Sequence, residues 1–237
     1  MALSMPSTVP LVDVEAVAES TFAVIEQGGI AIIPLDVAYA VVGHSEDAVR
    51  RMFAAKQRAF TKANGVFGSV ELMRELLIVE PRHADLVRAI TADHDLPMSV
   101  VAPYRAGHPM VRALSSFVLE RTTQDNTMDM LMNAGSLHNA LAKRSLERQV
   151  AIVGSSANAS LTGSKFELSE VDRPVQEAAQ LMVDGGRCKY ANPERISSTI
   201  VRFPDLTVLR YGCCYAQIKA VFATAFGIEL PEKPALR

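Results

Sequence analysis

The chain has few of the features that mark disulfide-stabilised, zinc-binding or membrane-spanning proteins. Only three of its 237 residues are cysteines: Cys188, Cys213 and Cys214. The odd number argues against a disulfide framework, and the adjacent Cys213 and Cys214 are poorly placed to bridge each other. No Cys-x-x-Cys spacing occurs, so a structural zinc site is not expected. No apolar run approaches the ~20 residues that span a bilayer.

The chain also lacks a large excess of charge of either sign. Its net charge is -2, so any binding of nucleic acid must come from a local basic patch. Residues 1–10 have neither the basic nor the apolar segment of a signal peptide, and a cytoplasmic location is therefore expected. The composition, 49% hydrophobic and 21% charged, is that of an ordinary globular protein.

Several catalytic and cofactor motifs are missing as well. There is no G-x-S-x-G, Walker A or G-x-G-x-x-G sequence, so serine-hydrolase, P-loop and Rossmann functions have no support. The five histidines show no H-x-x-x-H spacing, which argues against a metal cluster. His94 lies between Asp93 and Asp95, and this triplet favours a solvated loop over a catalytic dyad.

Helical and strand patterns alternate along the chain and predict layered α/β packing in one domain over residues 1–237. No repeat or long linker divides it. Pro204-Asp205 joins the last two predicted strands like a hairpin, so a mixed sheet is expected. Helices are predicted over 12–27, 45–56, 71–77, 81–92, 111–121, 137–148, 171–180 and 215–226, and strands over 30–33, 65–69, 98–102, 128–132, 150–153, 181–183, 198–203 and 207–210.

Two short segments predict an anion-binding pocket. Residues 153–160 read V-G-S-S-A-N-A-S, which places short polar side chains and free backbone N–H groups at a turn after a strand. Lys56 and Arg58 add positive charge at the end of a helix. Each segment also has a plainer interpretation, as a capped loop and as cations that complement a helix dipole.

Taken in chain order, these segments resemble the YrdC-like family. P-L-D-V-A-Y-A at residues 34–40 resembles the family's P-T-[DE]-T-x-Y-G, and K-Q-R at 56–58 with Lys62 resembles its K-x-R-x-x-x-K. S-A-N at 156–158, D-G-G at 184–186, S-T-I-V at 198–201 and R-Y-G at 210–212 resemble its later motifs. The resemblance spans about residues 14–222. It implies a three-layer α/β domain with a twisted mixed sheet and a positively charged cavity.

The best-known members of this family are threonylcarbamoyl-adenylate synthases, which use ATP, bicarbonate and L-threonine on the way to a tRNA modification. The resemblance implies ATP as cofactor, with Mg²⁺, and double-stranded RNA or tRNA as a further partner. It implies catalytic roles for Lys56 and Arg58. The binding residues that it implies are Asp36, Tyr39, Lys62, Ser156, Asn158, Ser198 and Arg210.

The chain departs from the family where the threonine substrate would bind. Leu35 and Val37 replace two threonines, and Ala40 replaces a glycine. A site that loses hydroxyl groups loses affinity for a polar ligand. The first hypothesis is therefore an enzyme that forms a carbamoyl- or acyl-adenylate and acts on a less polar substrate than threonine, or on threonine itself. The second is a non-catalytic module that binds nucleotide or RNA. A third, an enzyme of another class on the same scaffold that uses His94 or His138 as acid or base, has little support in the sequence.

Overall fold

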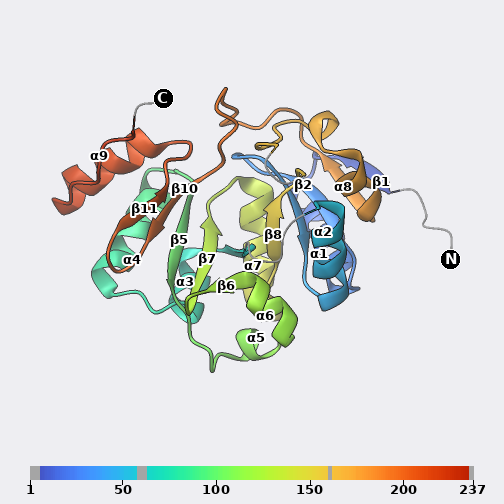
Figure 1. The fold of residues 1–237 in the computed structure, drawn as a ribbon, viewed down its shortest axis with the longest axis horizontal. Helices are drawn as coiled ribbons and strands as arrows, with labels where there is room; N and C mark the ends of the chain where they lie inside the picture. The colour runs from blue at the N-terminus through green and yellow to red at the C-terminus, as the bar shows by residue number, and fades with distance from the viewer. Residues whose placement is uncertain (1–5, 58–62, 160–161, 235–237) are drawn as a thin grey trace.

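The computed structural model describes residues 6–57, 63–159 and 162–234. All described strands belong to one mixed sheet in the order β1-β9-β2-β3-β8-β4-β7-β5-β10-β11, with β6 paired to β7 (Figure 1). Four neighbouring pairs are parallel (β1·β9, β2·β9, β4·β7 and β5·β10), and the others are antiparallel. The predicted mixed sheet and α/β class are thus confirmed.

The strands of the sheet are β1 (Ser7–Pro10), β2 (Ala31–Pro34), β3 (Tyr39–Gly43), β4 (Gly65–Gly68), β5 (Met98–Pro103), β6 (Thr123–Gln124), β7 (Thr127–Met132), β8 (Val153–Ser156), β9 (Leu181–Asp184), β10 (Thr199–Arg202) and β11 (Thr207–Arg210). The α-helices are α1 (Val14–Glu26), α2 (Glu46–Ala55), α3 (Val70–Leu76), α4 (Pro81–Arg88), α5 (Pro109–Arg112), α6 (Ser116–Thr122), α7 (Ser136–Arg148), α8 (Arg173–Ala178) and α9 (Tyr215–Phe226).

Alternation along β2 shows how the layers form. Ala31 and Ile33 pack in one cluster with Phe22 of α1 and Leu141 of α7. Ile32, between them, packs in another cluster with residues of α2 and α8. Because successive side chains of a strand point to opposite faces, this part of the sheet is covered by helices on both sides. Helix, sheet and helix therefore make three layers.

The central strands use the same alternation differently. Met128 and Met130 of β7, with Val66 of β4, point into the largest apolar cluster, to which α3, α4 and α9 also contribute. The residues next to them in sequence, Asp129 and Gly65, line a cavity instead. One set of side chains thus builds the core, and the intervening set is left to form a site.

Two helix starts are capped by side chains. The Asp13 carboxylate accepts a hydrogen bond from the Ala16 N–H at 3.1 Å, and the Ser45 hydroxyl accepts one from the Ala48 N–H at 3.2 Å. Such caps satisfy N–H groups that have no partner inside the helix. Helix α2 begins at the predicted Ser45 cap, whereas α1 begins at Val14, two residues after the predicted start.

Several predicted elements are wrong in detail. The helix over 111–121 is two short helices, α5 and α6, because the Ser115 hydroxyl caps a new start at Val118 N–H, 3.3 Å away. Strand β3 was not predicted, although its five residues are all buried. The strand over 150–153 is displaced, since β8 begins at Val153 and Val150 is tied to Ser145 at the end of α7. Strands β1 and β6 were also not predicted.

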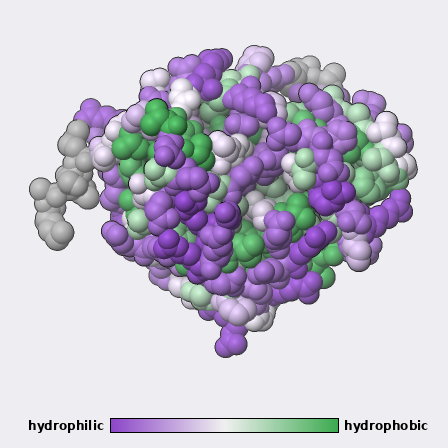
Figure 2. Space-filling model, turned by 180° about the vertical axis from the view of Figure 1, so that it is seen from behind, coloured by the Kyte–Doolittle hydropathy of each residue, from purple (hydrophilic) through white to green (hydrophobic). Residues whose placement is uncertain are grey.

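The rear face of the molecule is largely hydrophilic. The rear view shows polar groups over most of that face, with apolar groups in separate patches (Figure 2). Within the described residues, no helix combines the length and the apolar character that crossing a membrane requires.

Candidate active site

A cavity of about 300 Å³ lies over the central strands of the sheet. Its walls come from segments that are far apart in sequence: the β2–β3 connection and β3, the end of α2, the strands β4, β5, β7 and β8, and the segment between β9 and β11. The lining residues are Leu35, Val37, Ala38, Tyr39, Ala40, Lys56, Ala63, Gly65, Phe67, Ser99, Asp129, Leu131, Gly154, Ser155, Ser156, Asn158, Ser164, Ser197, Ser198 and Arg210.

Lys56 brings a buried positive charge to one end of this cavity. It is the C-cap of α2, and its side chain is only 3% exposed. Its ammonium group donates hydrogen bonds to the Ser156 carbonyl oxygen and, at 3.3 Å, to Asn158 Oδ1. Because a buried ammonium group needs acceptors, these bonds hold it in position.

The segment 155–159 differs from its sequence-based interpretation. Ser155 and Ser156 lie in strand β8, paired with Val41 and Ala40 of β3, and not in a turn after the strand. The expected free N–H groups are used inside the protein. Ala157 N–H donates to the Tyr39 carbonyl at 2.8 Å, and Ala159 N–H donates to the Asp172 carboxylate at 2.7 Å. The segment therefore positions Lys56 rather than offering a ring of free amides.

Ser198 and Arg210 form the opposite end of the cavity. The Arg210 guanidinium donates to the Ser198 carbonyl oxygen at 2.7 Å and to its hydroxyl at 2.8 Å. Gly212 allows this contact, since a Cβ there would lie 2.2 Å from the Ser198 carbonyl carbon. The R-Y-G sequence thus needs its glycine for a close approach between two backbone segments.

Tyr39 and Asp36 are placed differently from each other. Tyr39 lines the cavity, but its hydroxyl donates to the Gly186 carbonyl at 2.9 Å and accepts from Gly185 N–H at 3.1 Å. Burial raises its pKa to about 12. Asp36 is not part of the cavity wall; its carboxylate lies 3.8 Å from the Lys189 ammonium, and burial raises its pKa. Tyr39 therefore joins two of the motif segments, and Asp36 lies outside the site.

The structure adds one charged residue that the sequence analysis missed. Asp129 of β7 lines the cavity between Gly65 and Ser99. Desolvation raises the pKa of its carboxyl, against the opposing effects of Arg210 and the Ser99 hydroxyl. One signal was present in the sequence: Met128, Met130 and Met132 alternate, which puts Asp129 on the other face of an interior strand.

Neither histidine of the third hypothesis lines the cavity. His138 is fully buried under Phe67, with ring centroids 4.5 Å apart, and burial lowers its pKa to about 4. His94 is exposed at the end of the short helix that follows α4, beside Asp93, which pairs with Arg88 at 2.8 Å. A histidine that stays neutral in the core is poorly suited to exchange protons with a substrate.

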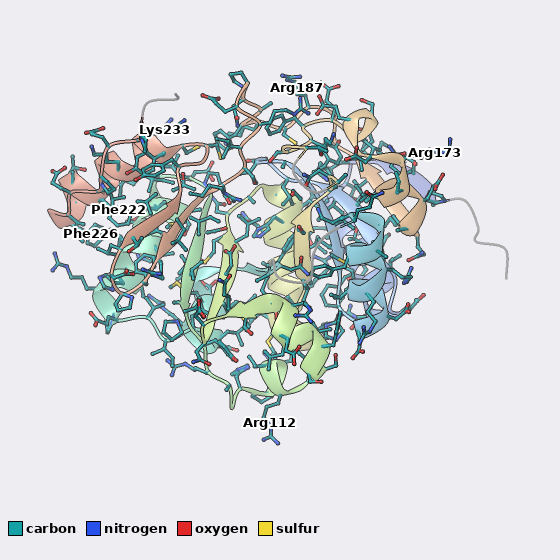
Figure 3. The ribbon with its side chains drawn as sticks, in the orientation of Figure 1. Arg112, Arg173, Arg187, Phe222, Phe226 and Lys233 are labelled. Atoms are coloured by element: carbon teal, nitrogen blue, oxygen red, sulfur yellow. The ribbon has the colours of Figure 1, made fainter. Side chains whose placement is uncertain are left out.

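Two of the predicted cations cannot be placed. Arg58 and Lys62 lie outside the described residues. Arg50 and Arg51, the other basic residues nearby, pair with Glu46 and Asp47 at 2.7 and 2.8 Å. Elsewhere, Arg112, Arg173 and Arg187 point outward at the edge of the molecule (Figure 3). Among the described arginines and lysines, Lys56 and Arg210 are those that line the cavity.

The part of the chain that the structure describes contains no group of three or more His, Cys, Asp or Glu side chains that could hold a metal ion. Asp129 is the one carboxylate among the lining residues. A Mg²⁺ ion in the cavity would therefore need the phosphate oxygens of a ligand to complete its coordination, as is common for nucleotide-bound magnesium.

Comparison with known proteins agrees with this fold. The family model Sua5/YciO/YrdC, described as "Telomere recombination", matches residues 23–212. A search of the curated proteins finds no match.

Three solved structures share the fold. A hypothetical protein from Streptococcus mutans UA159 superposes with a TM-score of 0.80 at 18% identity, over 95% of this chain and 97% of that one. Sua5 of P. abyssi, complexed with L-threonine, gives 0.69 at 21% identity, over 88% of this chain and 58% of Sua5. HypF in a phosphate- and nucleotide-bound form gives 0.62 at 18%, over 87% of this chain and 30% of HypF. At these identities the likeness shows the fold alone.

Proposed function

We propose, from the premise that this chain belongs to the Sua5/YciO/YrdC family, that its cavity binds ATP and forms an acyl- or carbamoyl-adenylate from a substrate other than threonine. The chain spans little more than half of Sua5 and less than a third of HypF, so the activities of those whole proteins are not assumed. The proposal concerns the cavity that is lined by residues of both the early motif segments, such as Lys56, and the later ones, such as Arg210.

The observation that carries the proposal is the placement of Lys56. A lysine that is almost fully buried, held by Ser156 and Asn158 in a cavity wall, presents a fixed cation where an entering phosphate would meet it. Fixed charges in a site of low dielectric stabilise phosphate oxygens without reorganisation during the reaction. Lys56 would then neutralise charge that develops as pyrophosphate leaves.

The remaining step is to bring a carboxylate or carbamate oxygen to the α-phosphate. Holding two reactants in one pocket makes their reaction effectively unimolecular, which contributes much of the rate acceleration in such reactions. ATP supplies the phosphoryl electrophile; Lys56 and the serine hydroxyls of the cavity orient it. If Mg²⁺ enters with ATP, the phosphates supply its main ligands.

The apolar side of the cavity argues for a substrate that differs from threonine. Leu35 and Val37 both line the cavity. At these two positions the family motif has threonines, so this chain lacks two hydroxyl groups there. Each lost hydrogen bond to a polar ligand costs about 1–3 kcal/mol when its partner stays buried. Weak activity with threonine and better activity with an amino acid of larger apolar surface are expected.

The RNA-binding alternative has less support. Its candidate contacts include Arg50 and Arg51, which are already paired with acidic side chains, and Lys56, which is buried. Such groups have little freedom to reach a phosphate backbone outside the protein. At most we expect weak binding that falls steeply with salt.

Pyrophosphate release tests the proposal. The purified protein is incubated with ATP, Mg²⁺ and bicarbonate, and each of the common amino acids is added in turn. Release that depends on ATP and on one or a few amino acids supports the proposal. Release that no amino acid stimulates, together with no measurable ATP binding by calorimetry, would reject it in favour of a different ligand.

A further inference from the structure

We infer that the end of the cavity around Asp129 binds a positively charged amino group of the ligand, and that a basic amino acid is the substrate class. This inference rests on the proposed function, in which the cavity takes an amino acid beside ATP. It assigns to Asp129 a role in specificity.

The first argument is that the Asp129 carboxylate, to which the Ser99 hydroxyl hydrogen-bonds, has no cationic partner and one oxygen without any partner among the described residues. Its Oδ1 atom is inaccessible to solvent and has no hydrogen-bond partner among the described residues. No lysine or arginine nitrogen of those residues lies within the 4.0 Å of an ion pair. Buried carboxylates in proteins are nearly always paired or bound to a cation, because an unpaired one is costly. Because Asp129 is only partly buried and lines the cavity, a ligand cation in the cavity would pair with the accessible part of its carboxylate.

The neighbouring Arg210 does not fill that role. Its guanidinium is directed to the carbonyl and hydroxyl oxygens of Ser198 at 2.7 and 2.8 Å. It acts on Asp129 only through space, where it lowers the carboxyl pKa against desolvation. The charges of Asp129 and Arg210 offset each other at longer range, so this end of the cavity offers little attraction to a phosphate. Lys56, at the other end of the cavity, is then the cation that attracts a phosphate group.

The second argument is the apolar part of the cavity wall. Leu35, Val37 and Leu131 line the same cavity as Asp129. An apolar wall that ends at a carboxylate is complementary to a methylene chain that ends in an ammonium group. Lysine has this form and threonine does not. The serine hydroxyls beside Asp129, Ser99 and Ser198, lie 3.2 Å apart and provide further oxygen acceptors.

A single divalent metal ion is the other cation that a carboxylate attracts. Metal sites built by proteins usually draw on several carboxylate, histidine or cysteine ligands, and no such group occurs in the described part of the chain. An organic cation, which one carboxylate and two hydroxyls can hold, agrees better with these donors.

Two matched ligands test the inference. L-lysine and L-norleucine have the same unbranched four-carbon side chain, and only lysine carries a terminal ammonium group on it. Their affinities are measured by calorimetry for the wild type, for Asp129→Asn, and for Asp125→Asn as control. Asp125 is an exposed turn residue with φ 49°, a conformation that asparagine also adopts readily.

The wild type and Asp125→Asn are expected to bind lysine at least about tenfold more tightly than norleucine, and Asp129→Asn to lose that preference. Equal affinity of the wild type for both ligands, no binding of either, or a preference that survives in Asp129→Asn would overturn the inference. Thermal denaturation shows whether each variant is folded.

A separate titration with ATP keeps the two proposals apart. ATP binding without a preference for lysine would reject the inference and leave the proposed function standing. A preference for lysine without ATP binding would reject the proposed function, and with it the adenylate-forming role of the bound lysine.

Discussion

The two ends of the cavity carry side chains of opposite charge, and these two side chains differ in how far the protein itself supplies their partners. Lys56 is buried and has two acceptors, the Ser156 carbonyl and Asn158 Oδ1. Asp129 has an oxygen with no partner among the described residues. The protein thus supplies hydrogen-bond acceptors for the buried Lys56 ammonium, but it supplies no partner for one oxygen of Asp129. The difference teaches that the fold holds the Lys56 ammonium between acceptors of its own, whereas Asp129 has the Ser99 hydroxyl but no ion-pair partner within the protein and would gain one from a ligand.

Removing the cation should have the largest effect. In Lys56→Met, the apolar chain is kept and the charge is lost, while Ser156 and Asn158 lose their shared donor. We expect ATP affinity to fall by a hundredfold or more, in line with about 3–5 kcal/mol for breaking a buried, hydrogen-bonded charge. Calorimetry with ATP measures this change.

The matched control is Lys143→Met. Lys143 is an exposed residue of α7 whose ammonium lies 3.9 Å from Glu147, and surface pairs of this kind contribute little. Its ATP affinity should equal that of the wild type. A Lys56→Met protein that is folded and still binds ATP normally would show that Lys56 serves structure only.

Replacing Leu35 and Val37 by threonine tests whether these two apolar residues exclude threonine as a substrate. In Leu35→Thr/Val37→Thr, two hydroxyl groups return to the cavity. We expect pyrophosphate release with threonine and bicarbonate to rise, by about 1–3 kcal/mol in transition-state binding for each new bond. Either single variant provides an intermediate reference. If threonine already supports rapid release in the wild type, the importance given to these two substitutions is wrong.

The unpaired carboxylate should also be visible in the pH dependence of stability. Burial raises the pKa of Asp129 in the folded state above its unfolded value of 3.8. The folded protein therefore binds the proton more tightly, and the stabilisation by protonation is present at low pH and lost as the pH rises through the folded pKa. Asp129→Asn should accordingly be more stable than the wild type at pH 7, with a smaller difference near pH 4.

Urea denaturation of both proteins at the two pH values gives these free energies. A variant that is less stable than the wild type at pH 7 would indicate that Asp129 has a favourable partner in the free protein. It would therefore weaken the contrast between the two ends of the cavity.

The smallest effect is expected for RNA. Arg50 and Arg51 are bound to Glu46 and Asp47, so Arg50→Ala/Arg51→Ala should change the affinity for a double-stranded RNA by no more than about twofold. Fluorescence titration at two salt concentrations measures it. A loss of tenfold or more would assign these residues to a phosphate-contacting surface.

Local signals in the sequence were sufficient for much of the fold. Ser45 marks the start of α2 because a cap depends on a side chain and the N–H three residues on. The hairpin of β10 and β11 follows from its short turn. Strand β3 was overlooked because it follows the motif segment directly, without a turn of recognisable chemistry, and because its pairing with β8 joins residues more than a hundred positions apart.

The candidate site could be predicted from the sequence only in part. Lys56, Ser156, Asn158, Ser198 and Arg210 line one cavity as their order in the resemblance predicts. Whether Ser156 and Asn158 contact a ligand or only hold Lys56 depends on contacts across about a hundred residues, which no local pattern encodes. Asp129 belongs to no motif, and only its alternation with buried methionines distinguishes it.

The central claim is that the phosphates of ATP bind at the Lys56 end of the cavity and stay away from Asp129. A crystal structure of the protein with ATP, Mg²⁺ and L-lysine tests it most directly. The account predicts phosphate oxygens within hydrogen-bonding distance of the Lys56 ammonium and the lysine side-chain ammonium beside Asp129. Phosphate bound between Asp129 and Arg210, or ATP bound outside this cavity, would contradict it.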